Sequence, residues 1–153
     1  MEIVIAAIDP GTVKVGYCFM SRKGTSVEFG VIKPASKALH ERLRDIQDAL
    51  DRLFARFRPA EVAVETPYVG RNAGSALTLA GGRAMAMVSA ARVGAKVFEY
   101  TAPEAKKAVT ASGCSSKEGV RRVIQLMLGL KDPPPEDAAD AVALALLHSG
   151  RAG

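Results

Sequence analysis

The sequence predicts an α/β fold in which helices flank a five-stranded mixed sheet. The first observation behind this prediction is the apolar run at residues 3–8, whose β-branched side chains are typical of a strand buried on both faces. The second is the order of the patterns along the chain, which is three strands followed by helix, strand, helix, strand and three helices. The third is the helix between the third and fourth strands, because such a crossover places the fourth strand parallel to the first.

Four further segments predict the rest of the sheet. A β-rich run at residues 14–20 and an alternating run at residues 27–31 are joined by a turn at residues 21–25, so the chain opens with an antiparallel meander. Two short runs at residues 61–65 and 96–100 supply the fourth and fifth strands. We expect the fourth strand to lie beside the first.

Five segments predict helices. The first repeats its apolar residues at helical spacing until Pro59 stops it, the second is rich in glycine, alanine and methionine, and three consecutive prolines give a stiff entry to the last. The predicted helices are residues 39–57, 72–93, 103–111, 116–128 and about 136–149.

Length and composition narrow the class of protein. A chain of 153 residues is expected to form a single domain over residues 1–153, and its formal net charge of +5 is compatible with a polyanionic partner. The apolar run at the start is short and is followed by Asp9, so neither a membrane span nor a signal peptide is expected. Cys18 and Cys114 are interpreted as two free thiols in a reducing cytoplasm.

Four carboxylates stand where predicted elements begin or end. Asp9 closes the first strand before a Pro-Gly turn, Glu65 closes the fourth strand, and Asp137 and Asp140 share one face of the last helix. Each of the first three has an ordinary structural explanation, as a turn residue, a polar strand end or a partner of the helix dipole. Such explanations suit Asp140 least, because an acid on an apolar helix face is costly unless a cation meets it.

The chemistry of these acids points to divalent metal ions. No lysine or arginine is expected close enough in sequence to neutralise them. Hard oxygen ligands suit Mg²⁺ or Mn²⁺, and there is no histidine and cysteine set that would favour zinc. Two such ions roughly 4 Å apart can clamp the attacking water and the leaving oxygen of a phosphoryl displacement. The residues themselves therefore indicate phosphodiester hydrolysis.

Six stretches that together cover nearly the whole chain carry a more specific signal. They are Ile-Asp-Pro-Gly-Thr at 8–12, Val-Glu-Thr-Pro-Tyr at 64–68, Asn-Ala-Gly-Ser-Ala-Leu at 72–77, Phe-Glu-Tyr at 98–100 with Lys106, Gly113 with Lys117, and the helix start at 137–145. In residue types, order and spacing they resemble the RuvC family of Holliday-junction resolvases, which have the ribonuclease H-like fold.

This resemblance implies a metal-dependent endodeoxyribonuclease that works as a homodimer. Such an enzyme nicks two opposite strands of a four-way DNA junction symmetrically during recombination and repair, and leaves 5′-phosphate ends that a ligase can seal. The resemblance assigns the catalytic and metal-binding roles to Asp9, Glu65, Asp137 and Asp140. Two Mg²⁺ ions per site are expected, and Mn²⁺ is expected to substitute for them.

The resemblance also implies contacts with DNA and with other proteins. The residues that match DNA-binding positions are Tyr68, Arg71, Asn72, Lys106 and Lys117. The helix over residues 72–93 matches the dimer interface, and RuvA and RuvB, a branch-migration motor, are the expected partners. The protein is expected in a bacterial cytoplasm, associated with the nucleoid when it works.

Some basic and aromatic residues allow a structural explanation beside the functional one. The segment from Lys106 to Arg122 carries an excess of positive charge that suits phosphates, although Arg121 and Arg122 fit a solvated helix face equally well. Tyr68 can stack on an unpaired base or pack as a partly buried loop aromatic.

The same holds for two features of the predicted helices. Gly81, Gly82, Ala84 and Ala86 let a neighbour approach closely, and that neighbour is either a second subunit or the chain's own sheet. His148 is expected at the surface, near a fraying helix end.

Three other classes of protein share part of the pattern. Actin-like sugar kinases have a similar Asp-Pro-Gly-Thr loop but need two such domains, and a ribonuclease H-like group that processes ribosomal RNA precursors ends its fourth strand in Gly-x-Pro, where this chain has Val-Glu-Thr-Pro. A junction-binding protein with a decayed site would be expected to lack at least one of the four acids. The junction resolvase is therefore the preferred interpretation.

Overall fold

The computed structural model describes residues 2–25, 27–66, 73–110 and 116–151. Its five strands form one mixed sheet in the order β3-β2-β1-β4-β5. Their bounds are β1 Val4–Asp9, β2 Val15–Ser21, β3 Val27–Ile32, β4 Glu61–Glu65 and β5 Lys96–Tyr100. The three opening strands pair antiparallel, whereas β4 lies parallel to both β1 and β5. The predicted meander, the crossover and the pairing of β4 with β1 are confirmed.

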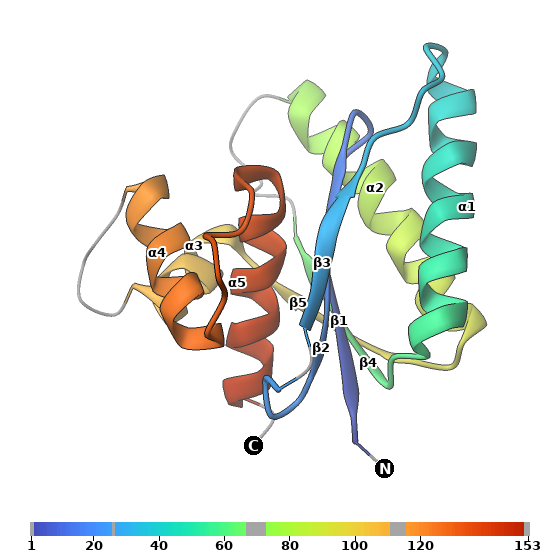
Figure 1. Cartoon of the computed structure of the whole chain (residues 1–153). Helices are drawn as coiled ribbons and strands as arrows, with labels where there is room; N and C mark the ends of the chain where they lie inside the picture. Colours follow the sequence, from blue (N-terminus) through green and yellow to red (C-terminus); the bar gives the residue numbers. More distant parts are fainter. Residues whose placement is uncertain (1, 26, 67–72, 111–115, 152–153) are drawn as a thin grey trace.

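Helices cover both faces of the sheet. In Figure 1, α1 (Leu39–Phe57) and α2 (Ala73–Arg92) lie on one side of the strands, and α3 (Ala102–Val109), α4 (Lys117–Leu128) and α5 (Glu136–Arg151) lie on the other. Each side has its own buried apolar cluster, because alternate residues of the strands point to opposite faces. Within the described residues, no helix combines the length and the apolar character that crossing a membrane requires.

Local capping explains where the helices around the site begin. Thr101 and Glu104 form a reciprocal capping box, so α3 starts at Ala102, one residue earlier than predicted. Ser116 caps α4 by accepting a hydrogen bond from the backbone of Gly119. These caps hold the first turns of two helices that carry lysines toward the carboxyl ends of the strands.

The C-terminal part of α5 corrects one prediction. His148 was expected at the surface, but its side chain is buried beneath the end of the sheet and is only 1% exposed. Its Nδ1 lies 2.7 Å from the hydroxyl of Tyr100, and its Nε2 lies 2.9 Å from Oε2 of Glu61. The helix continues to Arg151 and packs mainly on β1 and β2. Its last turns bring the imidazole to Tyr100 of β5 and Glu61 of β4, partners that sequence distance does not reveal.

Glycine at position 82 shows what the small residues of α2 do. A Cβ atom there would lie 2.6 Å from the backbone nitrogen of Gly11, in the turn that follows Asp9. Ala86 is also fully buried within the chain, whereas Ala84 is exposed. Packing on the chain's own sheet and turn therefore explains Gly82 and Ala86, and it brings α2 against the loop that leaves β1.

Candidate active site

The pairing of β1 with β4 brings two carboxylates together at one edge of the sheet. Ile8 is opposite Val64 in the parallel register, so the next residues, Asp9 and Glu65, end neighbouring strands side by side. Their side chains share a hydrogen bond. This edge is formed by the carboxyl ends of parallel strands, where α/β proteins commonly place their ligands.

The first turns of α5 add Asp137 and Asp140 to the same edge. The approach of α5 is close, because a Cβ atom at Gly16 would lie 2.5 Å from the carbonyl oxygen of Asp137 and 3.5 Å from the Cβ atom of Asp9. Only glycine at the start of β2 allows this contact. The main-chain packing of β1, β2 and α5 thus determines where the acids stand.

The prediction for the surroundings of Asp140 needs a correction. The body of α5 is buried as expected, but Asp140 itself is exposed and Asp137 is partly exposed. Both residues lie where the helix passes the edge of the sheet, so their carboxylates line a cavity instead of an apolar surface. The desolvation cost that the sequence assigns to Asp140 falls chiefly on Asp9.

The accumulation of negative charge has a marked effect on Asp9. Burial, the hydrogen bond that protonated Asp9 donates to Glu65, and the charges of Glu65 and Asp140 together raise the pKa of Asp9 to about 8, against a smaller opposing effect of Lys14. The pKa of Glu65 is also raised, first by burial, and the nearby Asp140 adds to this effect. It is unfavourable for these carboxylates to be ionised at the same time, and a cation between them would reduce their mutual repulsion.

Cations surround the acids, and the sequence interpretation missed one of them, Lys14. Lys14, on the turn between β1 and β2, forms an ion pair with Asp137 and so lowers the pKa of that carboxyl. Lys117, at the start of α4, lies 2.8 Å from Glu136. The expectation that no lysine close in sequence meets the acids is wrong, because Lys14 follows Asp9 by only five residues.

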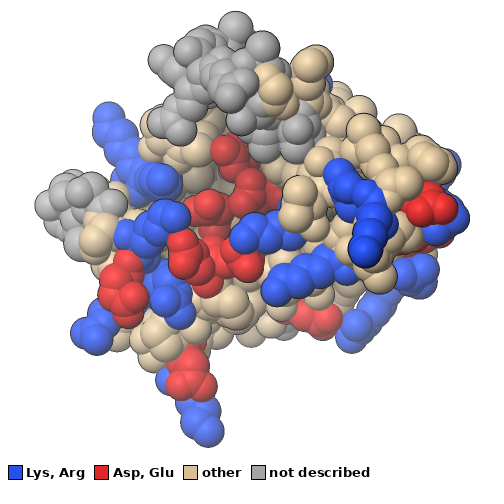
Figure 2. Space-filling view, turned by 90° about the horizontal axis from the view of Figure 1, so that it is seen from above, with Lys and Arg blue, Asp and Glu red and all other residues tan. Residues whose placement is uncertain are grey.

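A cavity of about 300 Å³ joins these groups. Its lining includes three of the four predicted acids, Glu136, and the basic residues Lys14, Lys106, Lys117 and Arg121. Glu65 lines a smaller adjoining hollow together with Lys106 and Asp140. Seen from this end of the molecule, Figure 2 shows acidic side chains gathered near the centre with basic side chains around them.

The donor set of this site suits a hard divalent cation. All four predicted ligands are carboxylates, and three of them influence one another's charge directly. As they stand, no three histidine, cysteine, aspartate or glutamate side chains among the described residues converge in a metal-ligand arrangement, and Asp137 is turned to Lys14. The residues therefore fit a metal provided that the Asp137 carboxylate leaves Lys14.

Comparison with known proteins identifies the family. From residue 5 to residue 148 the sequence matches the family described as "RuvC: Crossover junction endodeoxyribonuclease RuvC". The chain belongs to the RuvC family. It is 41% identical to the crossover junction endodeoxyribonuclease RuvC of Anaeromyxobacter dehalogenans, over 97% of this chain and 82% of that protein. It is 40% identical to the RuvC of Citrifermentans bemidjiense, over 99% of this chain and 94% of that protein.

A solved structure agrees with this assignment. Thermus thermophilus RuvC in complex with a Holliday junction substrate superposes with a TM-score of 0.86 at 30% identity, covering 98% of this chain and 94% of that one. The fold is therefore the ribonuclease H-like fold of RuvC, as the sequence motifs implied.

The DNA-binding residues implied by the RuvC resemblance divide into two groups. Lys106 and Lys117 are exposed and line the cavity. Tyr68, Arg71 and Asn72 lie outside the described residues, as does Cys114, so their predicted roles stay predictions. Cys18 is a buried free thiol, as predicted, and burial raises its pKa to about 12.

Proposed function

We propose that this protein is a metal-dependent crossover junction endodeoxyribonuclease that nicks four-way DNA junctions symmetrically. The observation that carries the proposal is the meeting of Asp9, Glu65 and Asp140 at one edge of the sheet, inside a ring of lysines, in a chain of the RuvC family. Phosphodiester hydrolysis needs both features, since the acids can hold metal ions and the lysines can attract the phosphate backbone.

We assign Asp9, Glu65, Asp137 and Asp140 the task of holding two Mg²⁺ ions, for which Mn²⁺ can substitute. Bound Mg²⁺ would supply Lewis acidity toward the scissile phosphate and the attacking water. The chain's own part is to present the carboxylates on rigid elements: two end paired strands, and two stand on a helix that packs closely on Gly16. Cleavage would leave 5′-phosphate ends.

The basic residues around the acids are assigned to the DNA. Lys106 and Lys117 reach the cavity from α3 and α4, on opposite sides of the loop between these helices. Phosphates held by such a rim are drawn toward the acids although the acids alone would repel them. Tyr68, Arg71 and Asn72, which follow β4 in the chain, complete the proposed DNA contacts.

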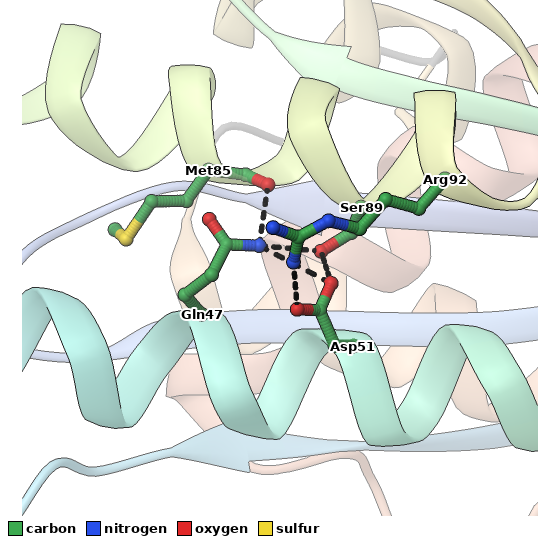
Figure 3. A network of polar contacts seen from close by, with 5 residues as sticks. All are labelled: Gln47, Asp51, Met85, Ser89 and Arg92. Atoms are coloured by element: carbon green, nitrogen blue, oxygen red, sulfur yellow. Dashed lines mark hydrogen bonds and ion pairs between the residues drawn. The ribbon is translucent and has the colours of Figure 1, made fainter.

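We further propose that the protein is a homodimer through the helix over residues 72–93. Leu77 on this helix is 75% exposed and Val88 is 42% exposed, which leaves an apolar surface for a second copy. A neighbouring face of α2 is anchored on α1 by a polar network (Figure 3), in which Ser89 donates to Asp51 at 2.7 Å and accepts from Gln47 at 2.8 Å.

This anchoring matters because a dimer that nicks symmetrically must hold its two sites in a defined relation. Arg92 extends the network by an ion pair with Asp51. Sedimentation of the wild type and of a Val88→Arg variant tests the interface: the wild type should sediment as a dimer and the variant as a monomer. RuvA and RuvB as partners, and a cytoplasmic, nucleoid-associated location, belong to the same proposal.

A cleavage assay on defined substrates tests the function. An end-labelled synthetic four-way junction is incubated with the protein beside a linear duplex of matched sequence and a single-stranded RNA, each with and without Mg²⁺. The proposal expects paired, symmetric nicks on the junction alone, and only when the metal is present. Cleavage of the RNA with the junction left intact would instead assign the chain to the ribosomal RNA-processing group and would overturn the proposal.

A further inference from the structure

Lys14 occupies a position that the main chain defines closely. It lies in the short turn between β1 and β2, and a Cβ atom at Gly11 would stand 2.4 Å from its carbonyl oxygen. Two residues later, Gly16 packs against the carbonyl oxygen of Asp137 at the start of α5. Two glycines thus fold the turn tightly and place it against the helix, so the side chain of Lys14 is delivered to the acids.

The side chain of Lys14 is the cation closest to Asp137 among the described residues. Its Nζ pairs with Oδ1 of Asp137, and the charges of Glu136 and Asp9 act on it as well. The side chain of Lys14 is 53% exposed, so the lysine can change partner without being pulled from a packed core. Lys117 differs, because its partner is Glu136, outside the four predicted ligands.

We propose that Lys14 is a tethered cation that competes with divalent metal for Asp137 and thereby sets the metal affinity of the site. The inference rests on the proposed function, which makes Asp137 a metal ligand. One oxygen of Asp137 is engaged by Lys14, so a metal ion must displace the ammonium group before this carboxylate can bind it. A lysine released in this way stays inside the cavity that Lys106 and Lys117 also line, where a phosphate oxygen can replace Asp137 as its partner.

Three variants separate this role from a structural one. Lys14→Met removes the charge and keeps most of the length, Lys14→Arg keeps the charge, and Lys23→Met removes a lysine beyond the other end of β2, away from the cavity. Because the pair is exposed, we expect Lys14→Met to bind Mn²⁺ about two- to fivefold more tightly than the wild type. Lys14→Arg and Lys23→Met should match the wild type.

The experiment titrates EDTA-stripped protein with Mn²⁺, follows the free ion by electron paramagnetic resonance, and uses no DNA. The increase in Mn²⁺ affinity of Lys14→Met over the wild type should become smaller when the salt is raised from about 50 mM to about 500 mM, because salt screens an exposed charge. Thermal unfolding gives a second readout: Lys14→Met should unfold at a lower temperature than the wild type in EDTA, and this gap should close at saturating Mn²⁺.

The outcomes are distinct. Equal or weaker Mn²⁺ binding by Lys14→Met, while the wild type binds and Asp9→Asn does not, would overturn the role of Lys14 and leave the proposed metal site standing. Wild-type protein that binds no Mn²⁺ would overturn the metal site and the inference together. Tighter binding by Lys23→Met to the same degree would show a general effect of net charge and would also overturn the inference.

Discussion

The most unusual consequence of the acidic edge is that it should destabilise the folded protein, and Asp9→Asn should therefore stabilise it in EDTA. Burial and the neighbouring acids raise the pKa of Asp9 from 3.8 to about 8. The folded state consequently binds a proton more firmly than the unfolded state does, so stability is lost as the pH rises from about 4 to about 8. Asparagine keeps the size and a hydrogen-bond donor but carries no charge at any pH.

The magnitude follows from the shift. One pKa unit corresponds to about 1.4 kcal/mol, so a rise of about four units sets an upper limit of roughly 5 kcal/mol at pH 8. The opposing charge of Lys14 is already included in that pKa, but the amide of the variant is buried at a cost of its own, which takes back part of the gain. We expect about 2 kcal/mol to remain, which raises the Tm of a domain of this size by about 4 to 8 °C.

The assay is thermal unfolding of the wild type and Asp9→Asn in EDTA at several pH values between about 4 and about 8, the window in which linkage acts. The amount by which the Tm of Asp9→Asn exceeds that of the wild type should be near zero at the acidic end of this pH range and greatest at the alkaline end. Asp132→Asn, which changes an exposed aspartate before α5, serves as the control and should follow the wild type. A variant less stable than the wild type at the alkaline end would refute the electrostatic reasoning.

Three further predictions concern the surroundings of the site. Gly16→Ala should lower the free energy of unfolding by about 1 to 3 kcal/mol, because the new methyl group meets the Asp137 carbonyl oxygen. The rate of junction cleavage should fall as well. Urea unfolding measures the first effect and the nicking assay measures the second. Glu136→Gln should free Lys117 and tighten junction binding about two- to fivefold at low salt, which a gel-shift titration at two salt concentrations measures; unchanged affinity would count against a DNA role for this lysine. His148→Ala should cost about 2 to 4 kcal/mol in urea unfolding, because it opens a cavity and leaves the buried Tyr100 hydroxyl without its partner, whereas Glu61 keeps its ion pair with Arg22. An unchanged midpoint would contradict that network.

The sheet could be predicted because its signals are local. The composition of residues 3–8 predicts a buried strand. The helix after the meander is a crossover, which makes β4 parallel to β1. Once those two strands are neighbours, Asp9 and Glu65 must share an edge. The helix pattern places Asp137 and Asp140 on one face at the start of α5. The resemblance to RuvC assigns these two acids to the same site as Asp9 and Glu65, so both kinds of evidence indicate one edge of the sheet.

What the sequence did not reveal depends on contacts between distant segments. His148 contacts Tyr100 and Glu61 because the last turns of α5 lie near β4 and β5. The sequence does not show this contact, so a histidine near a helix end was predicted to be exposed. Asp140 was predicted to lie on a buried face because its helix is apolar. It is exposed because it stands where that helix leaves the sheet.

Lys14 was missed for a different reason. It lies within a few residues of Asp9, but its pairing with Asp137 depends on the close approach of α5 to Gly16. Glycine inside a predicted strand signals close approach of a backbone, and that signal at position 16 could have drawn attention to the neighbouring lysine. Gly82, inside the helix α2, also marks close approach of a backbone, here to the turn after Asp9.

Metal-dependent cleavage of junction DNA is assigned to four carboxylates at one edge of the sheet. Two quantities are measured for the wild type and for Asp9→Asn, Glu65→Gln, Asp137→Asn and Asp140→Asn: the rate of paired nicking of a synthetic four-way junction in Mg²⁺, and the affinity for the same junction. Each variant should lose at least about a hundredfold in nicking rate, as removal of a metal ligand should cause, while junction affinity is kept. A variant that nicks at the wild-type rate, or a loss of nicking that follows from lost binding, would contradict the assignment of these carboxylates.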